Sequence, residues 1–187
     1  AERRATILAE ASSVLASSLD SATTLRTLSR LIVPTLADWC IIDLVTRDHA
    51  VERVAVAASD PNTQALLSEL QQYAPSLTSQ QPSAQAIRGG RAILFSEVTD
   101  ETLASTVRDA AHLALMRRLR PHSALAVPLV SRSRIVGALT LVRMIPGQRY
   151  DEADVKMAED LARNAALAVD NAGLYSQAGG SRAPAGS

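Results

Sequence analysis

Four apolar runs rich in β-branched residues, arranged as two pairs, most constrain the fold of this chain. The first pair is Cys40–Val45 and Val51–Ala58, and the second is Ser123–Val130 and Ile135–Met144. Within each pair only a short polar turn separates the runs, which predicts two antiparallel hairpins. Adjacent residues such as Ile41-Ile42 are both apolar, so both faces of each strand avoid water. We therefore predict a sheet that is covered on both sides.

The rest of the chain is predicted to be mostly helical. Apolar residues recur at three- and four-residue spacing in segments over residues 2–19, 20–33, 61–70, 83–90, 100–119 and 151–175. Asp151 and Asp154 resemble a capping box at the start of the last helix. Arg91–Phe95 is a brief additional strand. The terminal helices can cover one face of the sheet and the inserted segment Asp60–Leu119 the other, which predicts an α+β fold with a central, largely antiparallel sheet.

Composition narrows the classes of partner. The 187 residues include 19 Lys and Arg and 19 Asp and Glu, so their charges balance. The chain therefore has no excess positive charge to attract nucleic acid or an anionic membrane. No apolar run is long enough to cross a bilayer and no signal-peptide pattern is present, so we expect a cytoplasmic protein without membrane insertion. The single cysteine, Cys40, forms no internal disulfide and no cysteine cluster. Because the chain begins without methionine, we expect it to be a piece of a longer protein.

Two segments of the chain resemble a known family. SALAVPLVSRSRIVGALTLVR (Ser123–Arg143), followed by YDEADVKMAEDLARNAALAVDNAGLY (Tyr150–Tyr175), resembles the closing half of GAF domains. LADWCIIDLV with VERVAVAASDP resembles the opening half of GAF modules from bacterial sensor histidine kinases and PP2C-type (SpoIIE-like) phosphatases. The resemblance covers about Asp20–Tyr175.

The resemblance implies a GAF/PAS-like sheet with the first and last helices on one face and a small-molecule pocket under the inserted helices on the other. It also implies a dimer through the terminal helices and a signal that leaves along the last helix toward an output domain. We divide the chain into a signalling and dimerisation helix (1–19), a GAF domain (20–176) and a flexible linker or tail (177–187). GAF relatives bind cyclic nucleotides, linear tetrapyrroles, haem, small metabolites or nothing known, so fold does not choose the ligand.

The specific chemistries of the family find little support in the sequence. The cyclic-nucleotide signature is incomplete, and Asp100 is better interpreted as a helix N-cap. Neither His112 nor His122 has a cysteine nearby for tetrapyrrole attachment, and Cys40 has no partner for a reductase thiol relay. Haem would need an axial histidine, for which His112 is a weak candidate. No phosphate loop or nucleophile elbow is present, so we expect a non-catalytic domain without a resident cofactor or metal.

Strand alternation suggests where a ligand pocket would lie. If Asp43 pairs with Arg53, then Trp39, Ile41 and Asp43 share a face with Arg53, Ala55 and Ala57, while Cys40, Ile42, Leu44, Val54 and Val56 pack under the terminal helices. Trp39 is then a cavity wall, or simply a core anchor, and Cys40 is core filling. By position in the GAF pattern, the candidate pocket consists of Trp39, Ile41, Phe95, Ser96, Glu97, Val98, Leu103, Arg108, His112 and Met116.

The last helix carries a heptad-like stripe of mostly small residues, which favours close approach of a second helix. The candidate dimer interface is Ala158, Leu161, Ala165, Ala168, Ala172 and Tyr175. We therefore predict a bacterial sensory or regulatory domain that forms a homodimer and controls an attached kinase or phosphatase through an unknown small ligand. The alternative is a purely structural dimerisation module with no ligand.

Overall fold

A five-stranded antiparallel sheet forms the centre of the computed structural model, which describes the backbone of residues 2–17 and 21–180 and the side chains of residues 3–11 and 22–171. The strand order is β2-β1-β5-β4-β3. The strands are β1 (Trp39–Val45), β2 (Val51–Ala58), β3 (Ile93–Phe95), β4 (Ser123–Ser131) and β5 (Arg134–Arg143). Both predicted hairpins are present, and pairing of β1 with β5 joins them into one sheet.

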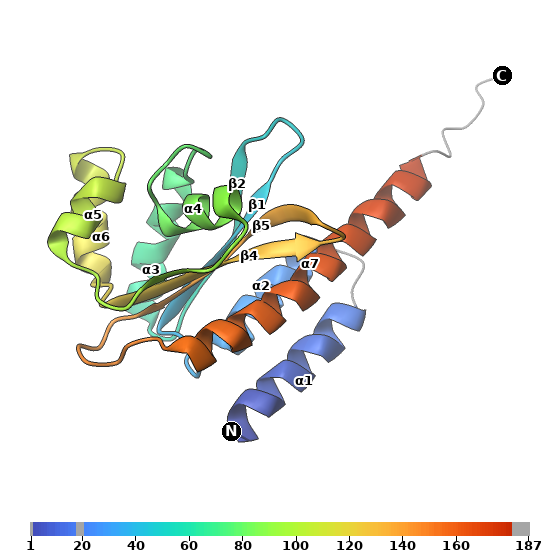
Figure 1. Ribbon diagram of the computed structural model, residues 1–187, viewed down its shortest axis with the longest axis horizontal. Helices are drawn as coiled ribbons and strands as arrows, with labels where there is room; N and C mark the ends of the chain where they lie inside the picture. Colours follow the sequence, from blue (N-terminus) through green and yellow to red (C-terminus); the bar gives the residue numbers. More distant parts are fainter. Residues whose placement is uncertain (1, 18–20, 181–187) are drawn as a thin grey trace.

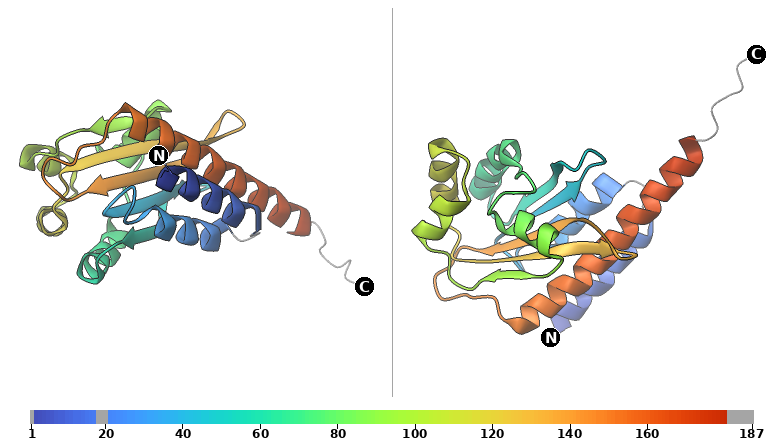
Figure 2. Two further views of the ribbon diagram at one scale, coloured as in Figure 1. Left: turned by 90° about the horizontal axis from the view of Figure 1, so that it is seen from below. Right: turned by 45° about the horizontal axis from the view of Figure 1, so that its top comes forward.

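Helices cover both faces of this sheet, as the apolar strands require (Figure 1). The helices α2 (Ser21–Ile32) and α7 (Glu152–Gly180) pack on one face, and α1 (Glu2–Ser17) lies against both of them, alongside α7 (Figure 2). The other face carries α3 (Pro61–Glu69), the 3-10 turn η1 (Leu70–Tyr73), α4 (Pro82–Gly89), α5 (Asp100–Thr106) and α6 (Ala110–Leu119). The predicted α+β architecture is therefore confirmed.

Alternation along the strands builds two separate cores. On β5, Leu139 and Leu141 point toward the terminal helices, whereas Ala138 and Val142 point toward the inserted helices. On β1, Cys40 packs in the core under the terminal helices, and Trp39 packs in the core under the inserted helices. We call these sides the terminal-helix face and the pocket face.

A β-bulge in β2 corrects one prediction about these faces. Ile42 pairs with Ala55 and Asp43 with Arg53, so Val54 is an extra residue in the ladder. The extra residue reverses the alternation beyond it. Arg53 lies on the pocket face as predicted, but Ala55 and Ala57 join the terminal-helix core. Val56, which was predicted to lie under the terminal helices, instead packs on the pocket face.

Cys40 is confirmed as a core residue on the terminal-helix face. Its side chain is fully buried, and the Sγ–H donates to the Ser29 carbonyl oxygen at 3.5 Å. Burial raises the pKa of the Cys40 thiol to about 12, because the thiolate would lose its hydration. The side chain therefore fills space in this core.

β5 approaches β1 closely at Gly137. A Cβ atom at this position would lie 2.1 Å from the Asp43 carbonyl oxygen, which is backbone and cannot move aside easily. Glycine is therefore required here by the distance between the strands. This contact holds the backbone of Asp43 in the middle of the sheet.

Helix ends agree with the predicted capping pattern at α7 but not at α5. The Asp151 N–H donates to Asp154 Oδ2 at 2.9 Å, and the Asp154 N–H donates to Asp151 Oδ1 at 3.0 Å, which confirms the capping box. At α5 the N-cap is Thr99. Asp100 lies in the first turn and makes a two-pronged ion pair with Arg117, with both contacts at 2.9 Å.

The predicted stripe on α7 is largely used within the chain. Ala158, Leu161 and Ala165 are at most 1% exposed, because they pack on the sheet and on the other terminal helices. Ala168 is half-buried, whereas Ala172 and Tyr175 lie outside the residues whose side chains are described. Ala158, Leu161 and Ala165 are therefore not free to contact a second copy. α7 also continues to Gly180, into the predicted linker, and residues 181–187 lie outside the described part.

Candidate functional site

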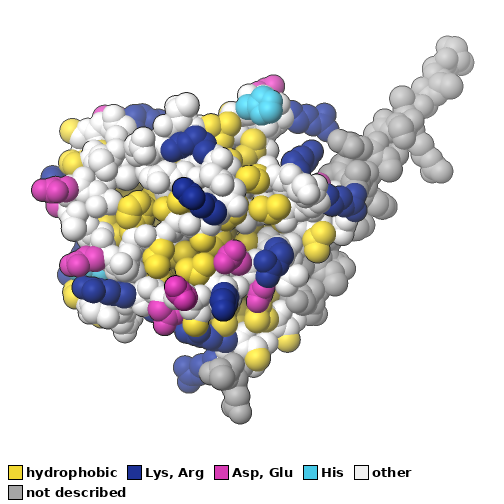
Figure 3. Space-filling model, in the orientation of Figure 1, with side chains coloured by type: hydrophobic (Ala, Val, Ile, Leu, Met, Phe, Trp, Pro, Cys, Tyr) yellow, Lys and Arg dark blue, Asp and Glu magenta, His cyan; other side chains and the backbone are white. Residues whose placement is uncertain are grey.

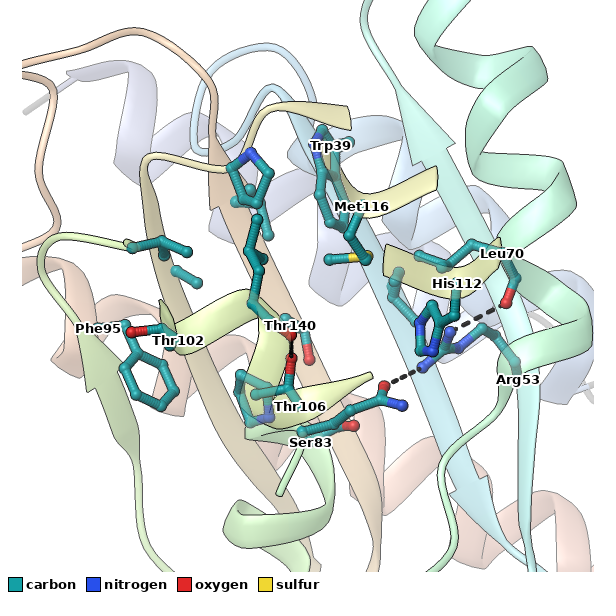
Figure 4. Close-up of a pocket in the computed structure, with 18 residues that line it drawn as sticks. Trp39, Arg53, Leu70, Ser83, Phe95, Thr102, Thr106, His112, Met116 and Thr140 are labelled. Carbon is teal, nitrogen blue, oxygen red and sulfur yellow. Dashed lines mark hydrogen bonds between the residues drawn. The ribbon is translucent and has the colours of Figure 1, made fainter. Parts of the chain in front are cut away.

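A cavity of about 60 Å³ lies between the pocket face of the sheet and the inserted helices (Figure 4). We call it the inner cavity. Strands β1, β2, β3, β4 and β5 form its floor and walls, and α5 and α6 form its roof. Its lining residues are Trp39, Ile41, Arg53, Leu70, Gln81, Pro82, Ser83, Phe95, Val98, Thr102, Leu103, Thr106, His112, Met116, Pro121, Ala124, Thr140 and Val142. A volume of this size has room for a few water molecules.

Trp39 serves as both a core anchor and a cavity wall. Its side chain is 2% exposed and packs with Leu67, Leu70, Leu115 and Leu119. The indole Nε1–H donates to the Leu119 carbonyl oxygen at 3.3 Å, which satisfies its one polar group. Trp39 therefore fits both interpretations that the sequence left open, a cavity wall and a core anchor. The hydrogen bond of its indole also connects β1 to the end of α6.

Arg53 and Asp43 form a buried ion pair beside the cavity. Arg53 Nε donates to Asp43 Oδ1 at 2.9 Å and Nη2 to Oδ2 at 3.4 Å, with side chains 3% and 0% exposed. Nη1 also donates to the Leu70 carbonyl oxygen at 3.1 Å, and Nη2 to Gln81 Oε1 at 3.4 Å. The guanidinium thus joins β1, β2, η1 and the start of α4, and its charge is compensated by one carboxylate.

His112 is a buried, neutral imidazole at the same end of the cavity. Its Nδ1 accepts the Arg108 backbone N–H at 3.0 Å, so the ring proton resides on Nε2. The ring stacks on Tyr73 with centroids 4.4 Å apart. Burial lowers the pKa of His112 to about 4, with smaller contributions from the charges of Arg53 and Arg108. Within the described part of the chain, Nε2–H makes no hydrogen bond.

Thr140 places a hydroxyl without a partner in the cavity wall. It lies on the central strand β5, its side chain is 8% exposed, and Oγ1 has no hydrogen-bond partner among the described residues. Burying a hydroxyl in this way costs roughly 1–3 kcal/mol. In the view of Figure 4, Thr140 lies between Phe95 on one side and His112 with Arg53 on the other. A partner for this hydroxyl must come from the cavity.

The structure brings most of the predicted pocket residues together. Seven of the ten line the inner cavity: Trp39, Ile41, Phe95, Val98, Leu103, His112 and Met116. Ser96 and Glu97 do not, because they follow the end of β3 and are exposed, and Glu97 pairs with Arg149 at 3.2 Å. Arg108 is on the outer surface, where Nη2 donates to the Ala74 carbonyl oxygen at 2.9 Å.

Sequence reasoning missed the contribution of the second hairpin and of the 81–83 segment. Ala124, Thr140 and Val142 could have been found, because alternation along that hairpin places them on one face. Gln81, Pro82 and Ser83 lie where a polar loop enters α4, and no periodicity marks them. Thr102 and Thr106 face the cavity from the short helix α5, which has no wholly buried residue to mark its inner side.

A larger and more polar groove of about 340 Å³ adjoins the inner cavity. Gln81 and Thr106 line both, so these two side chains separate the inner cavity from the groove. The groove is otherwise lined by Pro75, Ser76, Thr78, Ser79, Gln80, Ser105, Val107 and Arg108.

The described residues lack two further kinds of feature. They contain no group of three or more His, Cys, Asp or Glu side chains arranged to hold a metal ion. None of the described helices combines the length and the apolar character that crossing a membrane requires.

Comparison with known proteins places the chain in a family. The sequence matches the family model of the GAF domain over residues 20–169, so the chain belongs to the GAF domain family. No curated protein matches the sequence.

Three solved structures illustrate the structural likeness. The GAF domain of Acinetobacter phosphoenolpyruvate-protein phosphotransferase has a TM-score of 0.71 at 14% identity, covering 93% of this chain and 96% of that one. The free methionine-R-sulfoxide reductase of Neisseria meningitidis, solved with its substrate, gives 0.69 at 15% identity, covering 92% and 91%. The second GAF domain of DevS from Mycobacterium smegmatis gives 0.62 at 19% identity, covering 85% and 99%. At these identities the likeness shows the fold.

Replacement of Arg53 by methionine tests the buried ion pair. R53M leaves the Asp43 carboxylate buried without its partner, so we expect the free energy of unfolding in urea to fall by about 3–5 kcal/mol. The double variant D43L/R53M should recover most of that loss, because neither charge remains. R117A, which removes an exposed pair with Asp100, is the control and should barely move the midpoint. If R53M is as stable as the wild type, the stabilising role given to the Arg53–Asp43 pair is wrong.

Proposed function

We propose that this chain is a non-catalytic sensory domain of a cytoplasmic bacterial signalling protein, and that a small molecule in the inner cavity controls an attached kinase or phosphatase. The observation that carries the proposal is the inner cavity itself. Its lining is mostly apolar, and Thr140 Oγ1, His112 Nε2 and Ser83 Oγ are among its polar atoms that have no hydrogen-bond partner within the described residues. Binding sites for small molecules typically combine apolar walls with a few such polar groups.

The sheet offers a physical route from the cavity to α7. Thr140 faces the cavity, while its neighbours Leu139 and Leu141 on β5 pack in the core that contains α7. A ligand that displaces β5 or changes its packing therefore also changes the surface on which α7 rests. α7 extends past the sheet as a long helix, in the direction along which a following domain would be attached (Figure 1).

The position of Cys40 supports a non-catalytic role. Some solved relatives in fold are methionine-R-sulfoxide reductases. A thiol reaction in the inner cavity would need a cysteine there, and the one cysteine of this chain is buried on the opposite face of the sheet with a raised pKa. On the face shown in Figure 3, charged side chains of both signs are interspersed, which suits a domain without a nucleic-acid partner.

We further propose that the domain forms a homodimer through α1 and α7. The first three residues of the heptad-like stripe pack in the chain's own core, so we place the contact on the outer side of α7. There Leu167 is 47% exposed, with Arg163 and Asp160 preceding it at helical spacing. A second copy would cover this leucine and bring charges of opposite sign together.

A purely structural dimerisation module is the second candidate. It is favoured by the small volume of the inner cavity, about 60 Å³, because ligand pockets are usually several times larger. The two candidates differ in whether the inner cavity accepts a molecule.

Filling the inner cavity tests the sensory proposal. Ala124 is 6% exposed and lines the cavity, so A124L should fill it, whereas A111L makes the same change at an exposed position of α6. We expect ligand-observed NMR with a library of small fragments to find binders to the wild type and to A111L that are lost in folded A124L. Fragments that bind all three proteins equally, or none, would favour the structural module.

Replacement of Leu167 by glutamate tests the dimer. We expect light scattering to give the mass of a dimer for the wild type and of a monomer for L167E, because a charge would be buried in the interface. L94E is the matched control, because Leu94 is similarly exposed, at 40%, but lies on the edge strand β3. A wild-type monomer at high concentration, or a dimer that survives L167E, would contradict this interface.

A further inference from the structure

We infer that the ligand of the inner cavity is a neutral, mostly apolar molecule with one hydrogen-bond-accepting oxygen, which Thr140 Oγ1 and His112 Nε2 bind together. The inference rests on the proposed function and assigns a chemical class to the ligand of that site. Three observations support it: the apolar lining, the lack of hydrogen-bond partners for Thr140 Oγ1 and His112 Nε2, and the compensated charge of Arg53.

The body of the ligand must be apolar because the walls are. Aromatic and aliphatic side chains from β1, β3, β5, η1 and both roof helices surround most of the cavity. These side chains are Trp39, Ile41, Leu70, Phe95, Val98, Leu103, Met116 and Val142. A flat ring or short aliphatic body buries its surface well against such walls.

The oxygen acceptor follows from the two free polar atoms. His112 Nε2–H can only donate, because Nδ1 accepts the Arg108 N–H and thereby fixes the tautomer. Thr140 Oγ1 can donate as well, and it finds no acceptor within the described chain. A carbonyl oxygen has two lone pairs and can accept from both. Thr140 belongs to β5 in the floor of the cavity and His112 to the roof helix α6, and in the view of Figure 4 the His112 ring lies to one side of Thr140.

The neutral charge follows from the arrangement around Arg53. The guanidinium is the one charged group that lines the cavity within the described residues, and the Asp43 carboxylate contacts it at 2.9 Å and 3.4 Å. Its further donors are directed at Leu70 and Gln81. Since the pair is compensated, no net positive charge remains to offset the desolvation of a carboxylate or phosphate.

Three probes of nearly the same shape separate these requirements. Acetophenone carries a carbonyl oxygen, α-methylstyrene replaces that oxygen by a methylene carbon, and benzoate carries a negative charge. Trp39 is the single tryptophan and lines the cavity, so its indole N–H resonance in a ¹H–¹⁵N correlation spectrum reports binding without ambiguity. We expect acetophenone to bind about tenfold more tightly than α-methylstyrene, the equivalent of one buried hydrogen bond, and benzoate to bind more weakly than both.

Two valine substitutions connect the preference to Thr140. T140V removes the hydroxyl with little change of shape and should abolish the preference for acetophenone over α-methylstyrene. T24V is the matched control, because Thr24 is also buried with an unpartnered hydroxyl among the described residues but lies in α2 on the terminal-helix face. T24V should keep the preference. Both variants should fold, since each removes a buried hydroxyl that has no partner.

Each contrary outcome contradicts a different part. If acetophenone and α-methylstyrene bind equally, or if the preference survives T140V, the claim that the ligand carries an oxygen accepting from Thr140 is wrong. If benzoate binds more tightly than the two neutral probes, the claim that the ligand is neutral is wrong. If none of the three probes shifts the Trp39 resonance while library fragments bind the wild type and not A124L, the ligand class is wrong and the proposed function stands. If neither the probes nor the fragments bind, both fail.

Discussion

A single sheet with two buried faces is the constraint on which the rest of the structure depends. Side chains alternate along β1 and β5, so neighbouring residues such as Trp39 and Cys40 must serve different layers. The terminal helices cover one layer. The inserted helices cover the other layer except at the inner cavity, where the lining side chains leave space. The position of the site is thus a consequence of which side of each strand a residue occupies.

Polar groups within this arrangement are fixed from several directions. Arg53 is held by a carboxylate on β1, a carbonyl oxygen of η1 and a side-chain amide near α4. His112 is held by a backbone N–H and by the ring of Tyr73. Thr140 Oγ1 and His112 Nε2 remain without partners among the described residues, so the cavity is ordered in advance for a molecule that brings an acceptor.

Much of the fold could be predicted from the sequence, because hydrophobic periodicity and capping residues are local signals. The hairpins, the capping box of Asp151 and Asp154, and the opposite faces of Trp39 and Cys40 all follow from such signals. The bulge at Val54 could not be predicted, since nothing in the local pattern marks one extra residue, and it moved Ala55 and Ala57 to the other face. The burial of Ala158, Leu161 and Ala165 within the chain could not be predicted for a related reason: small residues suit close packing on a sheet of the same chain as well as on a second helix.

The central claim is that the inner cavity is built to hold a molecule that satisfies Thr140 and His112. A high-resolution crystal structure of the protein tests this directly. The account predicts ordered density in the cavity, from water or a small molecule, within hydrogen-bond distance of both Thr140 Oγ1 and His112 Nε2. A cavity filled by protein side chains, with Thr140 Oγ1 bonded to another atom of the chain, would contradict it.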